Sequence, residues 1–427
     1  MRIKGVKLEN YKSFKEASVD IGDFAVIVGA NASGKSNFLG ALRFLRDASL
    51  YGFSDAISLQ GGVEFLGNLY SEDPTTLEYE FDVDDSLTYF SRNTSFATSK
   101  NRNLRIVPTS LRYVVTIEHD KTNTQVSQAA IISYGFVEYV GKSSKIVGVS
   151  TLRITHNRNG ITVKHGEVPS DIKDRFGVSP KKIEEYFSPY LGLSPEIRKK
   201  FFETREAVPI VDRSSYIING ADFSQLSFFD FDPRLAKQSS KFAGKKELEE
   251  DGSNFNVAMN YVLEEEKNKK RFVNLLADFL PFITNFNVDQ SLDRSMLSVF
   301  SESEDGRNDF PSYAMSDGTM YLACLVLGVS FSTKPLMVIE EPEKYIHPSL
   351  AVKVIDYLKS ASSQKQIIIT SHSPQIVKYA GIENVMVVAR KEKGSKLMRA
   401  MEIPHVEKYL ENEVGLDQIF SDNLLSF

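Results

Sequence analysis

The chain has 427 residues, of which 42% are apolar and 25% are charged. These fractions are typical of soluble globular proteins, and the length suits one large domain or about two to three ordinary ones, which argues against disorder and disulfide scaffolds. The 51 basic and 56 acidic residues leave a net charge of −5, and the single cysteine is Cys324. Neither nucleic acid nor a membrane is attracted by the overall charge, and a reducing compartment is expected.

The first 50 residues contain the pattern of strands followed by a helix. No signal peptide is apparent, and spaced apolar positions favour short strands before an apolar strand at residues 24–28. A glycine-rich turn follows this strand. A helix is then expected from Gly34 to about Ala48, because Phe38, Leu42 and their apolar neighbours fall on one face.

The glycine-rich turn, Gly29-Ala-Asn-Ala-Ser-Gly34-Lys35-Ser36, satisfies the phosphate-loop pattern G-x-x-x-x-G-K-[ST]. Backbone N–H groups and the helix N-terminus would hold phosphate oxygens. Lys35 would reach the β- and γ-phosphates, and the Ser36 hydroxyl would ligate Mg²⁺. A plain glycine turn is the alternative, and the strand before it and the helix after it argue against that interpretation. The predicted nucleotide-binding residues of the turn are Gly29, Asn31, Ala32, Ser33, Gly34, Lys35, Ser36 and Asn37.

The middle of the chain, about residues 54–310, mixes two kinds of pattern. Alternating polarity predicts strands, and helical spacing predicts helices. The strands are expected at Thr76–Val83, Leu111–Glu118 and Ile146–Thr155, and the helices at about Pro180–Arg205 and Phe255–Phe282. Without repeats or sustained heptads, this part is predicted to be a compact α+β insert and not a coiled coil. Basic clusters lie at residues 100–105, 198–200, 241–246 and 267–271, and an acidic loop at 301–309.

The last third returns to alternating helices and apolar strands, a pattern typical of a parallel sheet. A buried helix is expected at Met320–Phe331, and strands at Leu336–Ile339, Ile367–Thr370 and Val385–Ala389. Two of these strands end in polar residues that suit a nucleotide site. Glu340 can hold Mg²⁺ through water, and Glu341 can orient or deprotonate the attacking water. Two solvated glutamates at a strand end are the alternative.

Three further polar positions lie near helix starts and strand ends. His372 follows the strand at Ile367–Thr370, where it could stabilise or sense the γ-phosphate, or simply be a satisfied polar group. His347 has a weaker case, since it can merely open the next helix, with Pro348 in its first turn. Ser316, before Asp317-Gly-Thr319, suits an N-cap.

As an ordered set, these motifs resemble the Walker A, signature, Walker B and switch-histidine motifs of ABC-type ATPases. The segment Leu8-Glu-Asn-Tyr-Lys-Ser-Phe14 resembles the start of the RecF, SMC and Rad50 branch. Ser316-Asp-Gly-Thr319, with Glu340-Glu-Pro-Glu343 and His347-Pro348, is similar to the OLD-like ATPases of the AAA class, which are common in bacterial anti-phage systems. The resemblance covers roughly residues 1–50 and 310–390.

The resemblance implies an α/β fold: an ABC-type P-loop ATPase head with a mixed, largely parallel core sheet and a large α+β insert, or lid. The corresponding segments are 1–53 with Walker A, 54–310 as the insert, and 311–427 with the other motifs. It also implies a nucleotide-sandwich dimer, in which Ser316 and Gly318 contact the γ-phosphate held by the other subunit. Lys12 and Ser13 would lie near the nucleotide, and Gln60 is the candidate Q-loop ligand of Mg²⁺.

Three departures from the family pattern stand out. Glu340 replaces the usual Walker B aspartate, and Asp317 stands where transporters commonly have glycine. The third concerns the Toprim nuclease domain into which full-length OLD proteins continue, because the last 37 residues of this sequence show no metal-binding acidic cluster. A built-in nuclease is therefore not expected.

Several functions fit this pattern. The first is a cytoplasmic, Mg²⁺-dependent ATPase that serves as sensor or scaffold of an anti-phage defence system, with a separately encoded nuclease or toxin as effector. In this respect the chain resembles the ATPase subunits of the PARIS and Septu systems. The second is a RecF-like DNA-repair or chromosome-associated ATPase whose basic clusters clamp duplex DNA, although those clusters also suit a solvated helix face. The third is an ATP-dependent assembly switch. A transporter subunit is the least favoured, and no apolar run reaches the about 17 to 25 residues that cross a bilayer.

Overall fold

The computed structural model describes residues 2–82, 104–120, 123–140, 143–157, 160–187, 223–241, 245–302, 308–392, 394–412, 414–422 and 424. The chain divides into two compact units. Unit 1 comprises residues 1–22, 32–225 and 389–397, and unit 2 comprises residues 23–31, 226–388 and 398–427. Both units are therefore assembled from segments that lie far apart in the sequence.

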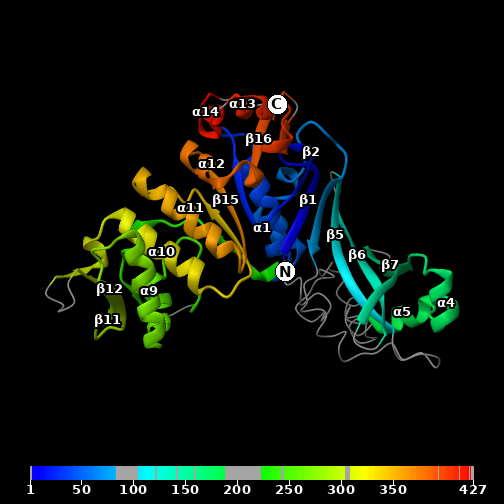
Figure 1. The fold of residues 1–427 in the computed structure, drawn as a ribbon, viewed down its shortest axis with the longest axis horizontal. Coiled ribbons are helices and arrows are strands. Elements are labelled where there is room, and N and C mark those ends of the chain that lie inside the picture. The colour runs from blue at the N-terminus through cyan, green and yellow to red at the C-terminus, as the bar shows by residue number, and fades with distance from the viewer. Residues whose placement is uncertain are drawn as a thin grey trace. The chain divides into compact units, whose positions relative to one another are not determined.

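Unit 1 is built on an antiparallel sheet with the strand order β8-β7-β6-β5-β4-β1-β2. Its last neighbour, β17 (Gly394–Arg399), runs parallel to β2, with Ser395 beside Phe14 (Figure 1). The remaining elements of the unit are β1 (Arg2–Tyr11), β2 (Phe14–Asp20), α1 (Lys35–Tyr51), α2 (Phe53–Leu59), η1 (Val63–Phe65), β4 (Thr75–Asp82), β5 (Leu104–Asp120), β6 (Asn123–Val140), β7 (Ser143–Asn157), β8 (Gly160–His165), α4 (Ser170–Phe176), α5 (Pro180–Phe187) and η3 (Phe223–Gln225).

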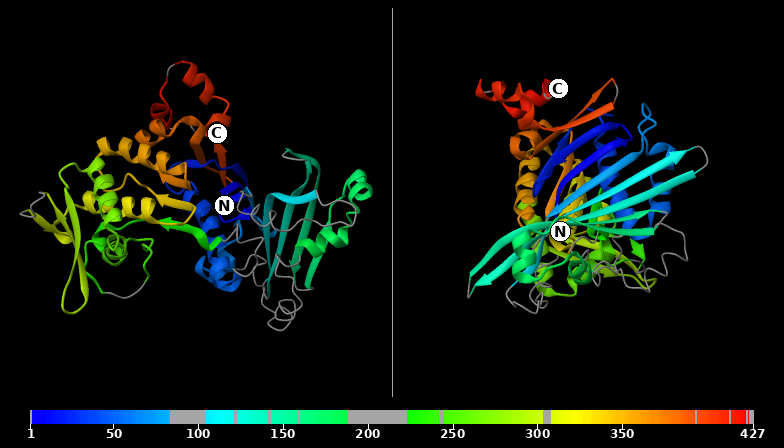
Figure 2. Two further views of the ribbon diagram at one scale, coloured as in Figure 1. Left: turned by 60° about the horizontal axis from the view of Figure 1, so that its bottom comes forward. Right: turned by 90° about the vertical axis from the view of Figure 1, so that its right-hand side faces the viewer.

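The strands β5, β6 and β7 have 17, 18 and 15 residues, and they lie side by side with α4 and α5 next to them (Figure 2). Alternating apolar residues bury one face, as expected for an antiparallel sheet that is solvated on the other. Helix α1 is joined to this sheet by a hydrogen bond. The buried Tyr79 hydroxyl of β4 donates to the Ala41 carbonyl of the helix at 2.7 Å. The phosphate-loop helix is thereby fixed within unit 1.

Unit 2 is built on a parallel sheet with the strand order β16-β3-β15-β14-β9. These strands are β3 (Phe24–Val28), β9 (Leu226–Phe229), β14 (Leu336–Glu340), β15 (Gln366–Ser371) and β16 (Val385–Lys391). Their apolar residues are buried on both faces, which explains the near-continuous apolar runs in the sequence.

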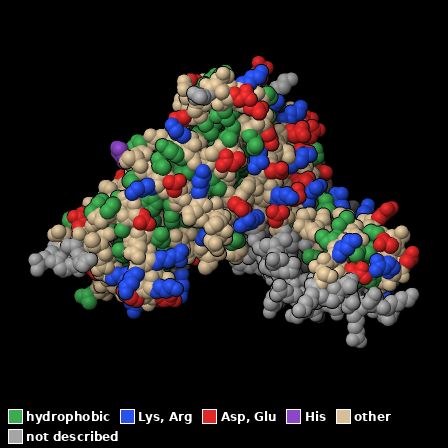
Figure 3. All heavy atoms as spheres, viewed as in Figure 1, with side chains coloured by type: hydrophobic (Ala, Val, Ile, Leu, Met, Phe, Trp, Pro, Cys, Tyr) green, Lys and Arg blue, Asp and Glu red, His purple; other side chains and the backbone are tan. Residues whose placement is uncertain are grey.

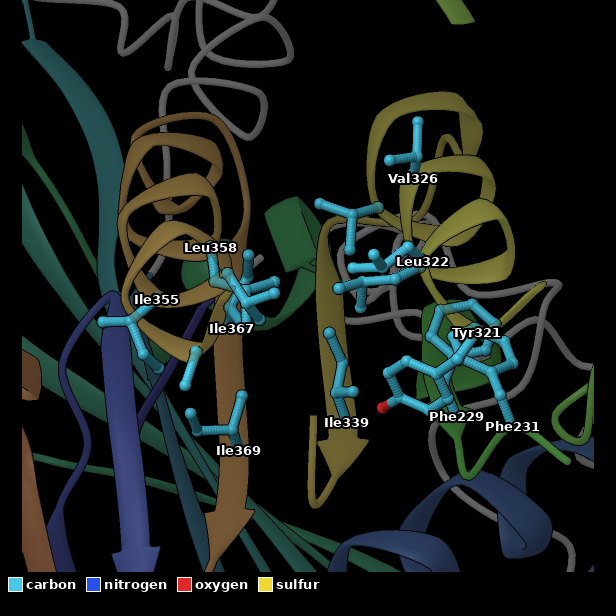
Figure 4. Packing of buried hydrophobic residues seen from close by; sticks show 14 of the residues in the cluster. Phe229, Phe231, Tyr321, Leu322, Val326, Ile339, Ile355, Leu358, Ile367 and Ile369 are labelled. Atoms are coloured by element: carbon cyan, nitrogen blue, oxygen red, sulfur yellow. The ribbon is translucent and has the colours of Figure 1, made fainter. Parts of the chain in front are cut away.

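One face of the parallel sheet is covered by α10 (Asp317–Phe331), α11 (Pro348–Ser362) and α12 (Pro374–Ala380). Figure 4 shows Leu358 of α11 above Ile367 of β15, while Tyr321 of α10 lies against Phe229 and Phe231. Every residue from Met320 to Leu327 is buried, so α10 is the apolar helix expected from the sequence.

The rest of unit 2 adds helices and a small antiparallel sheet, β10-β12-β11, with β13 paired to β12. Its elements are α7 (Pro233–Ala236), β10 (Ser240–Lys241), α8 (Phe255–Leu263), α9 (Glu266–Phe279), β11 (Asn285–Gln290), β12 (Ser295–Ser301), β13 (Asp309–Pro311), η4 (Ser312–Ala314), η5 (Ile382–Asn384), η6 (Ala400–Glu402), α13 (Val406–Glu411) and α14 (Leu416–Ser421). Phe255, Phe272, Phe286 and Phe300 of these elements belong to the same hydrophobic core as α10.

Because part of the expected insert shares this core, the insert does not form a unit of its own. Residues 54–310 do not separate as one unit, because 226–310 are in unit 2 with the last third of the chain, whereas 54–225 are in unit 1. Helices α8 and α9 pack against α10, and Phe300 of β12 is buried in the same core. This packing is not visible in the local pattern of the sequence.

Parallel pairing in unit 2 and antiparallel pairing in unit 1 confirm the α/β class with a largely parallel core. The helix expected at 255–282 is two helices, with a break at Glu264-Glu265. The 18-residue strand β6 was not predicted, and residues 188–205 of another expected helix lie outside the described residues. Among the residues that the structure describes, no helix has both the length and the apolar character needed to cross a bilayer.

Candidate active site

The carboxyl ends of three adjacent strands of unit 2 bring the predicted motifs to one edge of the sheet. Val28, the last residue of β3, lies beside Ser371 of β15, and Thr370 of β15 lies beside Glu340 of β14. The phosphate loop (Gly29–Ser36) therefore begins two strands away from the acidic turn (Glu340–Lys344), with His372 following the strand between them. Ligands of open α/β sheets bind at this kind of edge.

Within the acidic turn, Glu341 has a well-defined position. Its N–H donates to the Thr370 carbonyl at 3.0 Å, and its φ of 44° places it in the left-handed region, which is costly for a residue with a side chain. One carboxylate oxygen lies 3.2 Å from Nε2 of His372, and the other lies 3.4 Å from Nζ of Lys344. The candidate base and the candidate switch histidine are thus in direct contact.

Lys344 connects Glu341 to a second carboxylate, because its ammonium group also lies 3.0 Å from Asp230. Burial lowers the pKa of Lys344, but the hydrogen bond and charge of Asp230, together with Glu341, outweigh it and raise the pKa above the usual value. Lys344 is therefore held in the charged form, and its ammonium orients the Glu341 carboxylate.

Glu343, two residues after Glu341, holds the backbone at Ser371 and His372 in place. Its Oε1 accepts hydrogen bonds from the Ser371 hydroxyl at 2.6 Å and from the His372 N–H at 3.1 Å. Its Oε2 is buried and has no hydrogen-bond partner among the described residues. A buried carboxylate oxygen without a partner is costly, and such cost is typically retained at functional sites.

At the phosphate loop, the chain crosses from unit 2 to unit 1 between Asn31 and Ala32. Gly34 is the N-cap of α1, with φ 118°, and no side chain caps the helix. The first turn contains no acidic residue, and Lys35 at its start is only 7% exposed. The hydroxyl of Ser33 is buried without a hydrogen-bond partner in the described part of the chain. Uncapped N–H groups, a lysine and a spare hydroxyl suit an anion such as a phosphate.

Polar side chains of unit 1 hold the loop by its backbone. The Ser395 hydroxyl of β17 donates to the Ser33 carbonyl, and Arg390 donates to the Ala32 carbonyl at 3.4 Å. A Cβ atom on Gly34 would lie 2.6 Å from Oγ of Ser395 and 2.8 Å from Oγ of Ser13. Only glycine fits between these hydroxyls.

Asn37 and Lys12 are placed by their own hydrogen bonds. Nδ2 of Asn37 donates to Oγ of Ser13 at 2.8 Å, which joins two predicted nucleotide-binding residues. Nζ of Lys12 donates to Oε1 of Gln60 at 2.6 Å, and the Tyr11 hydroxyl donates to the same oxygen at 3.4 Å. Burial lowers the pKa of Lys12. The Gln60 oxygen, the candidate metal ligand, is thus engaged by two donors.

The signature segment (Ser316–Thr319) forms the start of α10. Oγ of Ser316 accepts from the Thr319 N–H at 3.1 Å, which is the N-cap that the sequence indicated. A Cβ atom on Gly318 would lie 2.7 Å from the carbonyl oxygen of Tyr345, so the segment after the acidic turn approaches this helix closely. The carboxylate of Asp317 pairs with Lys237, which follows α7.

His347 caps the helix that follows the acidic turn. It is the N-cap of α11: Nδ1 accepts from the Ser349 N–H at 3.2 Å, and Pro348 is in the first turn. This is the structural role that the sequence favoured.

The side chains expected to hold Mg²⁺ differ in their exposure. Ser36 is exposed in the first turn of α1, and Glu340 is half-buried at the end of β14. The described residues contain no group of three or more His, Cys, Asp or Glu side chains that could form a metal site. The hydroxyl of Ser36 and the carboxylate of Glu340 are each an oxygen ligand of the kind that Mg²⁺ prefers, and Mg²⁺ usually keeps several waters and binds substrate phosphates as well.

Four side chains with clear roles in this geometry were not assigned from the sequence: Asp230, Glu343, Lys344 and Ser395. Glu343 stood in the Glu-Glu-Pro-Glu run, and its distance of two residues from Glu341 was a usable signal. Asp230 and Ser395 come from distant segments, and only the fold brings them to the turn and the loop.

The described contacts give little support to the idea that the basic clusters form a surface for binding DNA. Residues 100–103, 198–200 and 242–244, and residues 303–307 of the acidic loop, lie outside the described residues. On α9, Lys and Arg side chains gather together with acidic ones (Figure 3). Lys269 donates to Asn287, Lys270 lies 4.0 Å from Glu266, and Arg271 lies over the Phe331 ring.

Residues 24–378 match the family described as "AAA domain, putative AbiEii toxin, Type IV TA system". The chain belongs to this family. The family is one of AAA-type ATPases, and membership of it implies that the chain binds a nucleotide.

Among curated proteins, the Old nuclease of Escherichia phage P2 is 29% identical over 102 residues. The matched region is 22% of this chain and 17% of that protein, so the chain spans about a sixth of its relative's length.

Several SMC heads are among the solved structures that resemble the chain. An SMC head bound to the C-winged helix domain of ScpA is 15% identical, covers 93% of this chain and 97% of that chain, and has a TM-score of 0.49. The SMC head domain from Thermotoga maritima is 14% identical over 93% of this chain and 99% of that chain, with a TM-score of 0.42.

Proposed function

We propose that this protein is a Mg²⁺-dependent ATPase that closes into a dimer around ATP and hydrolyses it. The contact between Glu341 and His372, at the sheet edge where the phosphate loop begins, carries this proposal. Because Lys344 holds the other carboxylate oxygen, Glu341 is oriented before any substrate arrives. Preorganised groups of this kind contribute to catalysis without rearranging during the reaction.

Each residue has a defined part in the proposed reaction. Mg²⁺, held by Ser36 and Glu340, would neutralise charge on the β- and γ-phosphates. Lys35 and the N–H groups of α1 bind the phosphates, and Glu341 accepts the proton of the attacking water. His372 orients Glu341 and lies where a γ-phosphate could be sensed. In the dimer, Ser316 and Gly318 contact the γ-phosphate held by the partner subunit.

The cellular role that we propose is a cytoplasmic sensor or scaffold of a bacterial anti-phage system, similar to the ATPase subunits of PARIS or Septu. A separately encoded nuclease or toxin would be the effector. Membership of a family described by a toxin and a toxin–antitoxin system supports this proposal, as does the partial likeness to a phage nuclease.

The decisive experiment is Glu341→Gln, which keeps the size of the side chain and removes its basicity. ATP hydrolysis should fall by about 100-fold or more, the usual contribution of a general base, whereas the dissociation constant for ATP should stay the same. The matched control is Glu407→Gln, on the exposed side of α13, which should hydrolyse ATP normally. If Glu341→Gln hydrolyses ATP at the normal rate, the assignment of the base is wrong.

The second candidate is the RecF-like ATPase that clamps duplex DNA. Three cations of α9 already have partners within the chain, which makes this candidate weaker. Affinity for duplex DNA that falls steeply with salt would favour it, because released counterions dominate such binding.

A further inference from the structure

The signature segment contains an acidic residue at a position where a negative charge is unfavourable for the proposed reaction. Asp317 lies between Ser316 and Gly318, the two residues that would contact the γ-phosphate of the partner subunit. A carboxylate beside a phosphate repels it, and the repulsion grows where water is excluded. Something must offset this charge if the dimer is to close around ATP.

Lys237 is the group that does so. Its ammonium pairs with the Asp317 carboxylate, and its side chain is only 18% exposed, compared with 44% for Asp317. The Lys237 carbonyl accepts a hydrogen bond from the buried Ser312 hydroxyl at 3.0 Å, so its backbone is fixed to the segment that leads into the signature. Both the backbone and the ammonium group of Lys237 are therefore held in place.

Stability of α10 alone does not account for this pair. The N-terminus of a helix carries a partial positive charge, so Asp317 in the first turn is favourable by itself, and a lysine there is unfavourable. The Ser316 side chain already caps the helix. The lysine therefore suits a site that must also accept an anion.

A cavity of about 680 Å³ borders Lys237, and its other lining residues are Arg234, Gln238, Ser239, Leu297 and Tyr313. Both cations of this lining are engaged, since Arg234 lies 3.1 Å from Asp232 and Lys237 pairs with Asp317. The charge of Lys237 is therefore directed at the signature segment and not at the cavity.

We propose that Lys237 is a positioning residue of the composite nucleotide site, which neutralises Asp317 so that the signature segment can bind the γ-phosphate of the partner subunit. This inference rests on the proposed sandwich dimer. Lys237 acts through Asp317 and does not contact the nucleotide, so removing the carboxylate should make the lysine dispensable.

The test measures dimerisation in saturating ATP by sedimentation, in the hydrolysis-deficient Glu341→Gln protein. Lys237→Met should weaken the dimer by about 10-fold, which corresponds to about 1.4 kcal/mol. Adding Asp317→Asn should restore the dimer to within about 3-fold, and Asp317→Asn alone should not weaken it, because the repulsion is then absent. The matched control is Lys378→Met, which removes another lysine paired with an aspartate of unit 2, Asp417 at 3.3 Å, and should leave the dimer unchanged.

Two further measurements separate the possible failures. Binding of a fluorescent ATP analogue to the monomer and the melting temperature should be the same in Lys237→Met and its parent. A dimer indifferent to Lys237→Met, or not restored by Asp317→Asn, overturns the role of Lys237. If the Glu341→Gln parent forms no ATP-dependent dimer, or one that Ser316→Ala leaves intact, the sandwich itself is overturned and this inference with it.

Discussion

The phosphate loop and the acidic turn each follow a buried strand of the same parallel sheet, but they are held in different ways. Donors from Arg390 and Ser395 hold the loop by its backbone carbonyls, and the residues between its glycines are small. Charged side chains hold the acidic turn, since Glu341 contacts both His372 and Lys344.

The difference fits the role that we propose for each turn. A phosphate is bound by N–H groups, so the loop needs a particular backbone path and room around it. A general base needs a carboxylate at one position and orientation, and neighbouring charges supply that. The loop should therefore be most sensitive to added atoms, and the acidic turn to lost charge.

The largest effect is expected for Gly34→Ala at the loop. A methyl group would meet Oγ of Ser395 at 2.6 Å, and the φ of 118° is strained for alanine. The loop must then move, and ATP binding should weaken by about 100-fold, or about 2.7 kcal/mol. The measurement is titration with ATP. The control is Gly67→Ala, also in unit 1, where a Cβ atom would lie 3.9 Å from Thr75 and cause no strain. An affinity within about 3-fold of normal would show that the loop is not held tightly.

A smaller effect is expected for Glu343→Gln in the acidic turn. The change keeps the shape but removes the charge that accepts from Ser371 and from the His372 N–H. Loss of a charge-assisted hydrogen bond is worth about 1.5 kcal/mol, so kcat should fall by about 10-fold. KM for ATP should not change, because the loop is untouched. If KM rises and kcat stays constant, Glu343 supports binding and the two turns are less distinct than their contacts indicate.

Much of this arrangement could be predicted from the sequence because its parts are local. A phosphate loop, a capping serine and an apolar strand that ends in glutamates each occupy a few consecutive residues. The strands β3, β14 and β15 were therefore predicted within a residue or two, and α10 was expected to begin at Met320, three residues after its observed start at Asp317.

The parts that could not be predicted depend on long-range packing. Asp230 and Ser395 meet the turn and the loop from segments more than 100 residues away, and nothing in their own neighbours indicates it. The division of the expected insert has the same cause, since Phe272 and Phe286 are buried with α10. The strand β6 was missed because its 18 residues mix small, polar and apolar side chains, with an irregularity in register near Phe136.

The smallest effect is expected for Lys12→Met, which removes the ammonium group that donates to Oε1 of Gln60 in unit 1. Burial lowers the pKa of Lys12, so the folded protein holds this proton less tightly than the unfolded chain does, and stability should rise as the pH increases through the lowered pKa. Methionine removes both this pH dependence and the penalty on the buried charge, and the melting temperature should not fall.

ATP binding by Lys12→Met should nevertheless weaken by about 3-fold, because a positive charge near the predicted phosphates is lost. The control is Lys15→Met on the exposed side of β2, which should change neither quantity. A melting temperature lowered by more than about 3 °C, with unchanged ATP affinity, would mean that Lys12 serves the fold. Charge would then matter for catalysis at the acidic turn but not for ATP binding at the loop. The two turns would differ more than the position of Lys12 near the loop suggests.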